Sequence, residues 1–190
     1  VPLLINWDFL SICGAWVFTS AVYFAFLAGA AFLVVEEMGK SEIEYGAYFI
    51  IASLCFMFGN LLSARFSYRF GLFRFVQCGA FLAFLSVSTQ WLLWDIDHPL
   101  SVFFPMFGVA IANGLVMPNA AAMIMGVVPR LSGAASGLSG FLQIGFAAIV
   151  TWLVGHFQFH NSFAMIIAMN FCAVLAISCV FLVRKIGNVE

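Results

Sequence analysis

The amino-acid sequence predicts an all-α membrane protein, a bundle of six transmembrane helices that forms one domain over residues 1–190. Of the 190 residues, 65% are hydrophobic and only 8% are charged, whereas a soluble domain carries about 25% charged residues. The apolar residues also fall into six runs, each long enough to cross the roughly 30 Å hydrocarbon layer of a membrane. Lipid is therefore the expected solvent, and no basic tract is present that would bind nucleic acid.

Hydropathy places the six spans, in chain order, at about residues 9–35, 45–64, 75–94, 100–127, 132–155 and 162–183. The first span follows the polar, aromatic edge of residues 6–8 and ends at an acidic loop, residues 36–44. A basic turn, Arg65–Arg74, separates the second span from the third, which ends in Asp95 and Asp97. No charged residue falls deep inside a span, where it would cost about 3 kcal/mol and is usually kept only for function.

The fourth and fifth spans carry the most informative residues. Asn113 and Pro118 interrupt the apolar fourth span. Because proline removes a backbone donor, it frees a carbonyl that must find another partner inside a membrane. The fifth span begins with small residues, so we expect Gly133, Gly137 and Gly140 to let another helix approach closely. The asparagine and the glycines are also compatible with helix packing alone, but their combination favours a transport cavity.

The charged residues predict the orientation of the bundle. Six of the seven basic residues are expected on the same side of the membrane as the two termini: Arg65, Arg69, Arg74, Arg130, Arg184 and Lys185. Lys40 alone is expected on the opposite side. Most acidic residues are expected on the side opposite the termini, and Asp8 and Glu190 are the exceptions. Because basic loops stay inside the cell, both termini are expected to be cytoplasmic.

Two stretches resemble the major facilitator superfamily of transporters. Gly59-x-Leu61, followed by Arg65, Arg69, Phe70, Gly71 and Arg74, resembles the degenerate second copy of the family's cytoplasmic loop motif, without its usual acidic residue. The stretches 113–119 and 132–140 resemble the drug-efflux branch of the family, in particular its Bcr/CflA type. The resemblance covers the whole chain. It implies the C-terminal half of such a transporter, built of two inverted three-helix repeats.

The resemblance also implies which spans form the substrate cavity: the first and fourth line it, the second and fifth flank it, and the third and sixth are peripheral. The expected cavity residues are Trp16, Thr19, Tyr23, Phe26, Asn113, Met117 and Gln143. Taken alone, the aromatic stripe of the first span is also compatible with a surface that faces lipid. Aromatic and methionine side chains with a few amide and hydroxyl groups suit chemically varied amphiphilic molecules.

The implied function is proton-coupled export of drugs or small amphiphilic metabolites across the bacterial inner membrane by alternating access. The expected partners are the lipid bilayer, the small-molecule substrate, protons and an N-terminal six-helix half, in the same or a separate chain. The titrating group would belong to that half, and Pro118 with the fifth-span glycines would permit helix movement. No cofactor or metal is expected. Because the sequence begins with Val1 and not with Met, we expect a piece of a longer chain.

Two other classes of protein compete with a transporter. A non-transporting membrane subunit or scaffold would have a similar composition, but it needs neither a proline break nor cavity asparagines. An intramembrane serine protease is suggested by Gly137-Leu-Ser-Gly140, which matches the GxSG pattern of rhomboid proteases. The last span contains no histidine to activate Ser139, and His156 and His160 are expected in a loop on the outer side. We therefore expect no enzyme.

Overall fold

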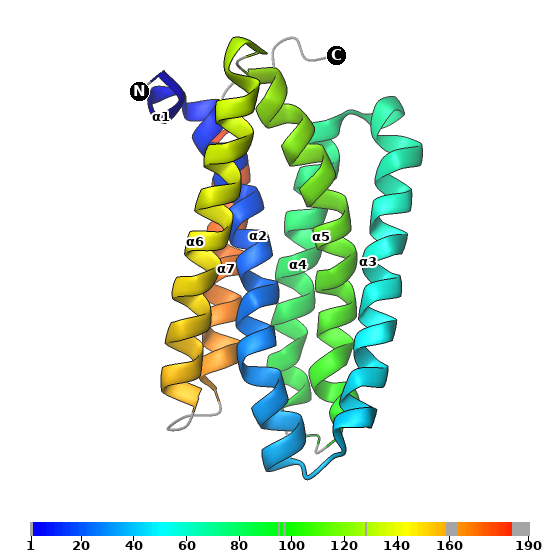
Figure 1. Ribbon diagram of the computed structural model, residues 1–190. Coiled ribbons are helices and arrows are strands. Elements are labelled where there is room, and N and C mark those ends of the chain that lie inside the picture. The colour runs from blue at the N-terminus through cyan, green and yellow to red at the C-terminus, as the bar shows by residue number, and fades with distance from the viewer. Residues whose placement is uncertain (1, 95, 97, 128, 159–162, 184–190) are drawn as a thin grey trace.

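The computed structural model describes residues 2–94, 96, 98–127, 129–158 and 163–183, and this part of the chain is a bundle of helices (Figure 1). Its elements are α1 (Pro2–Ile5), α2 (Trp7–Ala31), the π-helix η1 (Phe32–Glu37), α3 (Glu42–Phe70), α4 (Leu72–Leu93), α5 (Pro99–Val127), the 3-10 turn η2 (Pro129–Leu131), α6 (Ser132–Gln158) and α7 (Ala164–Leu182). Six of these helical segments are long and apolar enough to cross a membrane. The prediction of a six-helix membrane bundle is confirmed.

Side chains and one glycine fix several helix ends. The Asn6 Oδ1 atom accepts a hydrogen bond from the Phe9 N–H at 3.1 Å and caps α2. Ser41 caps α3 in the same way, because its Oγ accepts from the Glu44 N–H at 3.2 Å. Between α3 and α4 stands the single residue Gly71, with φ +90° and ψ 138°. Only glycine adopts that backbone readily, so it permits a one-residue turn.

The basic turn expected at Arg65–Arg74 is much shorter in the structure. Helix α3 continues through Arg65 and Arg69 to Phe70, and Arg74 already lies in the first turn of α4. Hydropathy falls before the helix ends because arginine side chains extend to the membrane surface while their backbone stays helical. Of the expected loop-motif residues, Gly71 alone forms the turn.

Helices α2 and α5 form the centre of the bundle. In their apolar segments 61% and 67% of the residues are buried, against 17% in α3 and 22% in α6. Helix α3 packs on α5 and α6 packs on α2, while α4 lies against α5 and α7 against α2. Exchanging α2 with α5, α3 with α6 and α4 with α7 reproduces the same pairs. This pattern fits two three-helix repeats that meet at α2 and α5 (Figure 1).

Glycines bring α3 and α5 to backbone distance. A Cβ atom placed on Gly114 would lie 2.5 Å from the Phe56 carbonyl oxygen and 2.7 Å from the Asn60 nitrogen. A Cβ atom on Gly59 would in turn meet the Ile111 carbonyl oxygen. These contacts need hydrogen in place of a side chain, as in other close membrane-helix crossings.

The predicted approach of another helix to the α6 glycines is not made within the described part of the chain, and it stays a prediction for a helix outside it. Apart from the adjacent residues and backbone of α6 itself, no described atom lies within 4 Å of a Cβ placed on Gly133, Gly137 or Gly140. A run of small residues shows that close approach is possible but does not identify the helix that makes it. In the described part of the chain α3 approaches α5 in this way, and Gly79 of α4 also lies close to α5, where an added Cβ would be 2.9 Å from the Ala112 carbonyl oxygen.

The carbonyl freed by Pro118 finds a partner on another helix. Pro118 lies inside α5, and the carbonyl four residues before it belongs to Gly114. The Ser63 hydroxyl on α3 donates to that oxygen at 3.1 Å, and the Asn119 Nδ2 donates to the Ser63 Oγ at 2.8 Å. The expectation of a substitute partner is thereby confirmed. Since both groups are buried, α3 is tied to the break in α5.

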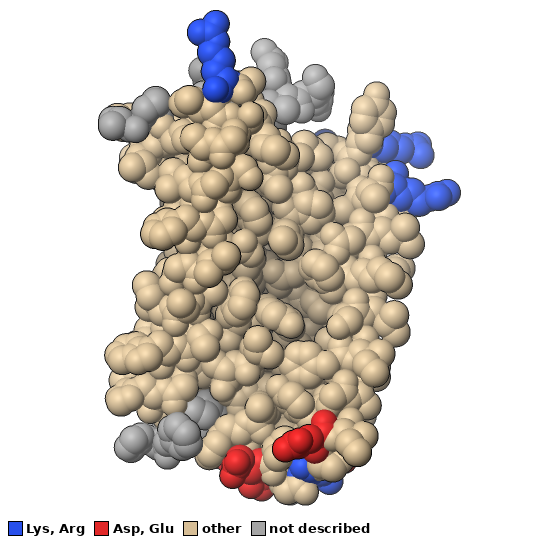
Figure 2. All heavy atoms as spheres, viewed as in Figure 1, with Lys and Arg blue, Asp and Glu red and all other residues tan. Residues whose placement is uncertain are grey.

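The charged side chains gather at the two ends of the bundle (Figure 2). The described arginines, Arg65, Arg69, Arg74 and Arg130, lie at the end that also holds α1 and η2. The glutamates predicted for a loop at 36–44 lie at the other end with Lys40, but they belong to the last residues of η1 and the first turn of α3, so the loop itself is shorter than predicted. Arg184, Lys185, Asp95, Asp97 and Glu190 fall outside the described residues. The uncharged band between the two ends is the part of the bundle suited to hydrocarbon.

Candidate functional site

A groove of about 320 Å³ opens between α2, α3 and α5, with one residue contributed by α6. The face turned to the viewer in Figure 2 is hollowed there, about midway between the charged ends. Its lining comprises Ser20, Tyr23 and Phe24 of α2, Phe49, Ala52, Ser53 and Phe56 of α3, Ala110, Asn113 and Met117 of α5, and Gln143 of α6. Within α2, α3 and α5 these positions recur every three to four residues, with adjacent pairs at 23–24 and 52–53, so each of these helices presents one face to the groove.

The groove brings together four of the seven residues predicted for a cavity. Tyr23, Asn113, Met117 and Gln143 all line it. They come from three helices that are far apart in the sequence, and none of them carries a charge at neutral pH. Hydrophobic contact with a few hydrogen bonds is therefore the chemistry that these side chains offer a ligand.

The other three predicted cavity residues lie in the packed interior and do not line the groove. Phe26 is fully buried against Phe103, with the ring centroids 5.4 Å apart. The Thr19 hydroxyl donates to the Ala15 carbonyl oxygen at 2.7 Å, which occupies it within its own helix. Trp16 is 8% exposed and belongs to the apolar cluster at the arginine end of the bundle. The predicted row of cavity residues on α2 is longer than the groove, which takes its α2 lining only from Ser20, Tyr23 and Phe24.

Two amides in the groove link neighbouring helices. The Asn113 Nδ2 donates to the Val109 carbonyl at 3.1 Å and to the Thr19 carbonyl on α2 at 3.4 Å. The Gln143 Nε2 donates to the Ser20 hydroxyl at 3.0 Å, which ties α6 to α2. These bonds fix polar groups in the apolar wall, where they are available to orient a ligand.

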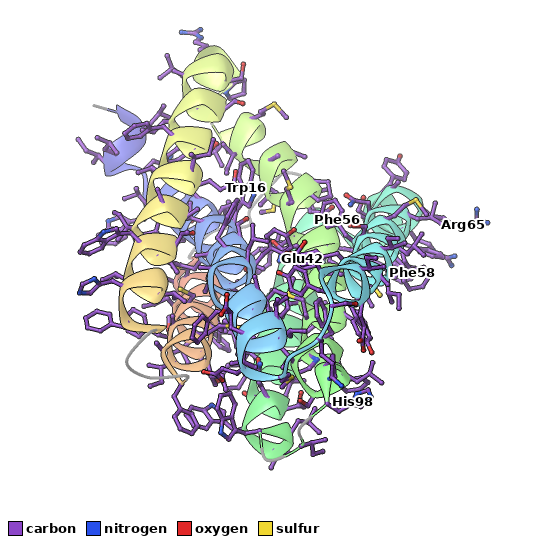
Figure 3. The ribbon with its side chains drawn as sticks, turned by 60° about the horizontal axis from the view of Figure 1, so that its bottom comes forward. Trp16, Glu42, Phe56, Phe58, Arg65 and His98 are labelled. Atoms are coloured by element: carbon purple, nitrogen blue, oxygen red, sulfur yellow. The ribbon has the colours of Figure 1, made fainter. Side chains whose placement is uncertain are left out.

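The contribution of α3 to the groove was not predicted residue by residue. Phe56 lies on the side of α3 that faces the bundle and lines the groove (Figure 3). Phe58 is 52% exposed and points away from the bundle, as does Arg65 (Figure 3). Nearly every position of α3 in the membrane is apolar, so the sequence offers little to distinguish these faces. The nearest signal is the pair of small residues Ala52 and Ser53 between phenylalanines.

The groups required for a serine protease do not come together in the described part of the chain. The Ser139 hydroxyl donates to the Ser136 carbonyl oxygen of its own helix at 2.9 Å. His156 lies 17 residues further along α6, about 26 Å away at 1.5 Å per residue. The prediction that His156 belongs to a loop is wrong, because α6 continues to Gln158. His160 falls outside the described residues.

Comparison with known proteins supports a membrane transporter. No family model matches the sequence, and no solved structure matches. The chain is similar to a protein named bicyclomycin resistance protein homolog of Haemophilus influenzae, with 25% identity over 158 residues that cover 81% of this chain and 39% of that protein. It is also similar to an uncharacterized transporter of Rickettsia felis, with 25% identity over 188 residues, 92% of this chain and 44% of that protein. The chain thus spans about two fifths of the length of these curated relatives. These likenesses and the six apolar helices together support a multi-pass membrane protein that transports.

Proposed function

We propose that this chain is the C-terminal half of a major facilitator superfamily transporter that exports drugs or small amphiphilic metabolites in exchange for protons. The observation that carries the proposal is the groove itself. It lies about midway between the charged ends, where the two central helices α2 and α5 face each other. Transporters built from inverted repeats bind their substrates near the membrane midplane at the interface between repeats.

The groove's composition favours amphiphilic substrates. Phenylalanines of α2 and α3 and Met117 supply large apolar side chains to its wall, whereas Asn113, Gln143 and the Tyr23 hydroxyl supply polar groups. Methionine and aromatic side chains adapt to ligands of different shape, which suits a broad substrate range. The bicyclomycin resistance name of one relative points in the same direction.

A second six-helix half would complete the cavity. Helices α3 and α6 border the groove and are the least buried of the six, at 17% and 22%. The chain also spans only about two fifths of its relatives' length. A partner half seated over these helices would cover their exposed apolar side chains. The open glycines of α6, such as Gly137, would then let a partner helix approach closely.

Proton coupling in this proposal depends on the partner half. Among the described residues that line the groove there is no Asp, Glu, Lys, Arg or His, so the proton-binding group would come from the other half. The arginine end would face the cytoplasm of a bacterial inner membrane, in accordance with the positive-inside rule. Alternating access would then consist of the two halves rocking about the groove.

Drug export by the complete transporter tests this proposal. The full reading frame is expressed in a bacterium without its major efflux pumps, and resistance to bicyclomycin, ethidium and tetraphenylphosphonium is compared between variants. We expect Tyr23→Ala and Asn113→Ala to change the relative resistance to these compounds at unchanged membrane abundance. Phe58→Ala, on the opposite face of α3, is the control and is expected to retain the wild-type profile. If both groove variants export every compound as the wild type does, the groove is not the substrate site.

A further inference from the structure

A second cavity, of about 280 Å³, lies at the acidic end of the bundle, far from the arginine end. Its wall includes Glu37 from the π-helix η1, Gln90 and Trp94 from α4 and its C-terminal cap, and Ser101 from α5. None of these residues belongs to the lining of the groove. Figure 3 turns this end of the bundle toward the viewer.

The buried amide of Gln90 lacks hydrogen-bond partners. Gln90 is 2% exposed, and neither its Nε2 nor its Oε1 makes a hydrogen bond within the described part of the chain. A buried polar group that is left unsatisfied costs free energy, so such groups are rare in folded proteins. Because this side chain also lines the cavity, an occupant of the cavity is its available partner.

The remaining polar groups of the cavity are mainly acceptors. The Ser101 hydroxyl hydrogen is engaged by the carbonyl oxygens of Ile96, at 2.9 Å, and of His98, at 2.8 Å, which leaves the oxygen of Ser101 to accept. Glu37 contributes a carboxylate, and Gln90 contributes an amide oxygen together with an Nε2 donor, which would bond a hydroxyl or phosphate oxygen of the same ligand. Trp94 adds an aromatic ring, which attracts cations to its face. A carboxylate, two neutral acceptors and an aromatic ring together favour a positively charged ligand.

The local backbone and the surrounding charge support this assignment. Helix α2 ends in a π-helical turn, in which the Met38 N–H donates to the Leu33 carbonyl oxygen five residues earlier, at 3.1 Å. Such turns are frequent at functional sites, and both Leu33 and Met38 line this cavity. The helix ends on either side of the adjoining loop carry Glu36, Glu42 and Glu44 against one described lysine, Lys40, so the local field attracts cations.

We propose that this cavity is a second ligand site, which binds an ammonium group through Glu37, Gln90 and Trp94. The ligand is a small organic ammonium ion or the ammonium headgroup of a lipid, because both present the same positive group at this end of the bundle. The inference does not depend on the proposed transport function. It requires only that η1 and the adjoining ends of α4 and α5 line one cavity.

Choline binding by the purified full chain tests the inference. Binding is measured by titration calorimetry in a sugar-based detergent, with the uncharged isostere 3,3-dimethylbutanol as the reference. We expect choline to bind saturably and the isostere not to bind. Because the trimethylammonium group of choline has no N–H to donate, Glu37 would attract it by charge alone, whereas the Gln90 amide would hydrogen-bond the choline hydroxyl. Glu37→Gln and Gln90→Leu are therefore each expected to weaken choline binding by about tenfold or more.

Matched variants separate binding from folding. Glu42→Gln and Gln77→Leu change the same residue types outside the cavity, Gln77 on the same helix as Gln90, and are expected to bind choline normally. Gln90→Leu is expected to melt at or above the wild-type temperature, because it removes an unsatisfied buried amide. Weakened choline binding by a variant that is at least as stable as the wild type therefore cannot be attributed to unfolding.

Three results would overturn the inference: no saturable choline binding, equal binding of the uncharged isostere, or unchanged choline binding by Gln90→Leu. Adding lipid distinguishes the two sources of the ammonium group. Competition by phosphatidylethanolamine, but not by phosphatidylglycerol, would assign the site to a lipid headgroup, whereas no competition by either lipid would assign it to a free amine.

Discussion

Replacing Gly114 by alanine tests the close packing that holds α3 against α5. The new Cβ atom would lie 2.5 Å from the Phe56 carbonyl oxygen, 2.7 Å from the Asn60 nitrogen and 2.9 Å from the Gly59 carbonyl carbon. All three are backbone atoms of α3, so no flexible side chain can move aside to make room. The two helices must instead separate by several tenths of an ångström or more.

Three terms determine the size of the effect. Overpacking a tight interior costs about 1–3 kcal/mol, and separating the helices weakens the Ser63–Gly114 hydrogen bond, worth about 1 kcal/mol. Alanine offsets about 1 kcal/mol of this loss because it is the better helix former. The expected loss of stability is about 1–3 kcal/mol, or a fall of about 2–12 °C in Tm at roughly 2–4 °C per kcal/mol for a chain of this size.

Thermal unfolding of the purified chain in detergent, followed by tryptophan fluorescence, measures this fall. Gly137→Ala is the matched control, because its Cβ atom would meet nothing within 4 Å while the gain in helix propensity is the same. We expect its Tm to equal or exceed that of the wild type. If Gly114→Ala has the same Tm as Gly137→Ala, the backbone contact between α3 and α5 does not exist as described.

Two further substitutions are measured in the same thermal assay. Ser63→Ala should lower stability by about 1–3 kcal/mol, because the Gly114 carbonyl and the Asn119 amide both lose a buried partner. Ser178→Ala is the control, because the Ser178 hydroxyl donates to the Val174 carbonyl oxygen of its own exposed helical turn, and its Tm should stay close to that of the wild type. Equal Tm values for the two serine variants would contradict the role given to Ser63. Gly71→Ala should cost about 1–3 kcal/mol, because φ +90° strains any residue with a Cβ atom. Gly46→Ala, near the start of α3, is the control and is expected to keep or raise the stability. The same Tm for Gly71→Ala and Gly46→Ala would refute the turn assigned to Gly71.

Hydropathy is sufficient to predict the six spans and most of their limits. The limit that it misplaces most is the end of α3, where Arg65 and Arg69 are helical residues. Composition cannot reveal this, because a helix that leaves the hydrocarbon carries the same residues as a loop. The turn is instead located by Gly71 and its positive φ angle.

The faces of the helices are harder to predict than their lengths. In lipid a helix gains little by turning one apolar side inward, so Phe56 and Phe58 look alike in the sequence although only Phe56 lines the groove. The glycines show the same limit: Gly114 lies at backbone contact, whereas Gly133 faces open space. Which helices pack together determines whether a given residue faces a neighbour, the groove or open space. The packing of α3 on α5 joins segments that are far apart in the sequence, so local sequence does not reveal it.

Water and drug access to Met117 tests the central claim, that the groove between α2, α3 and α5 is a substrate cavity. Each of two methionines, Met117 in the groove and Met57 on the exposed side of α3, is replaced by cysteine in the complete transporter after its native cysteines have been removed. The labelling rate with a charged, membrane-impermeant thiol reagent is then measured with and without an exported drug. We expect Met117→Cys to react and the drug to slow its reaction, while Met57→Cys stays unlabelled. An inert Met117→Cys beside a reactive Met57→Cys would contradict the claim.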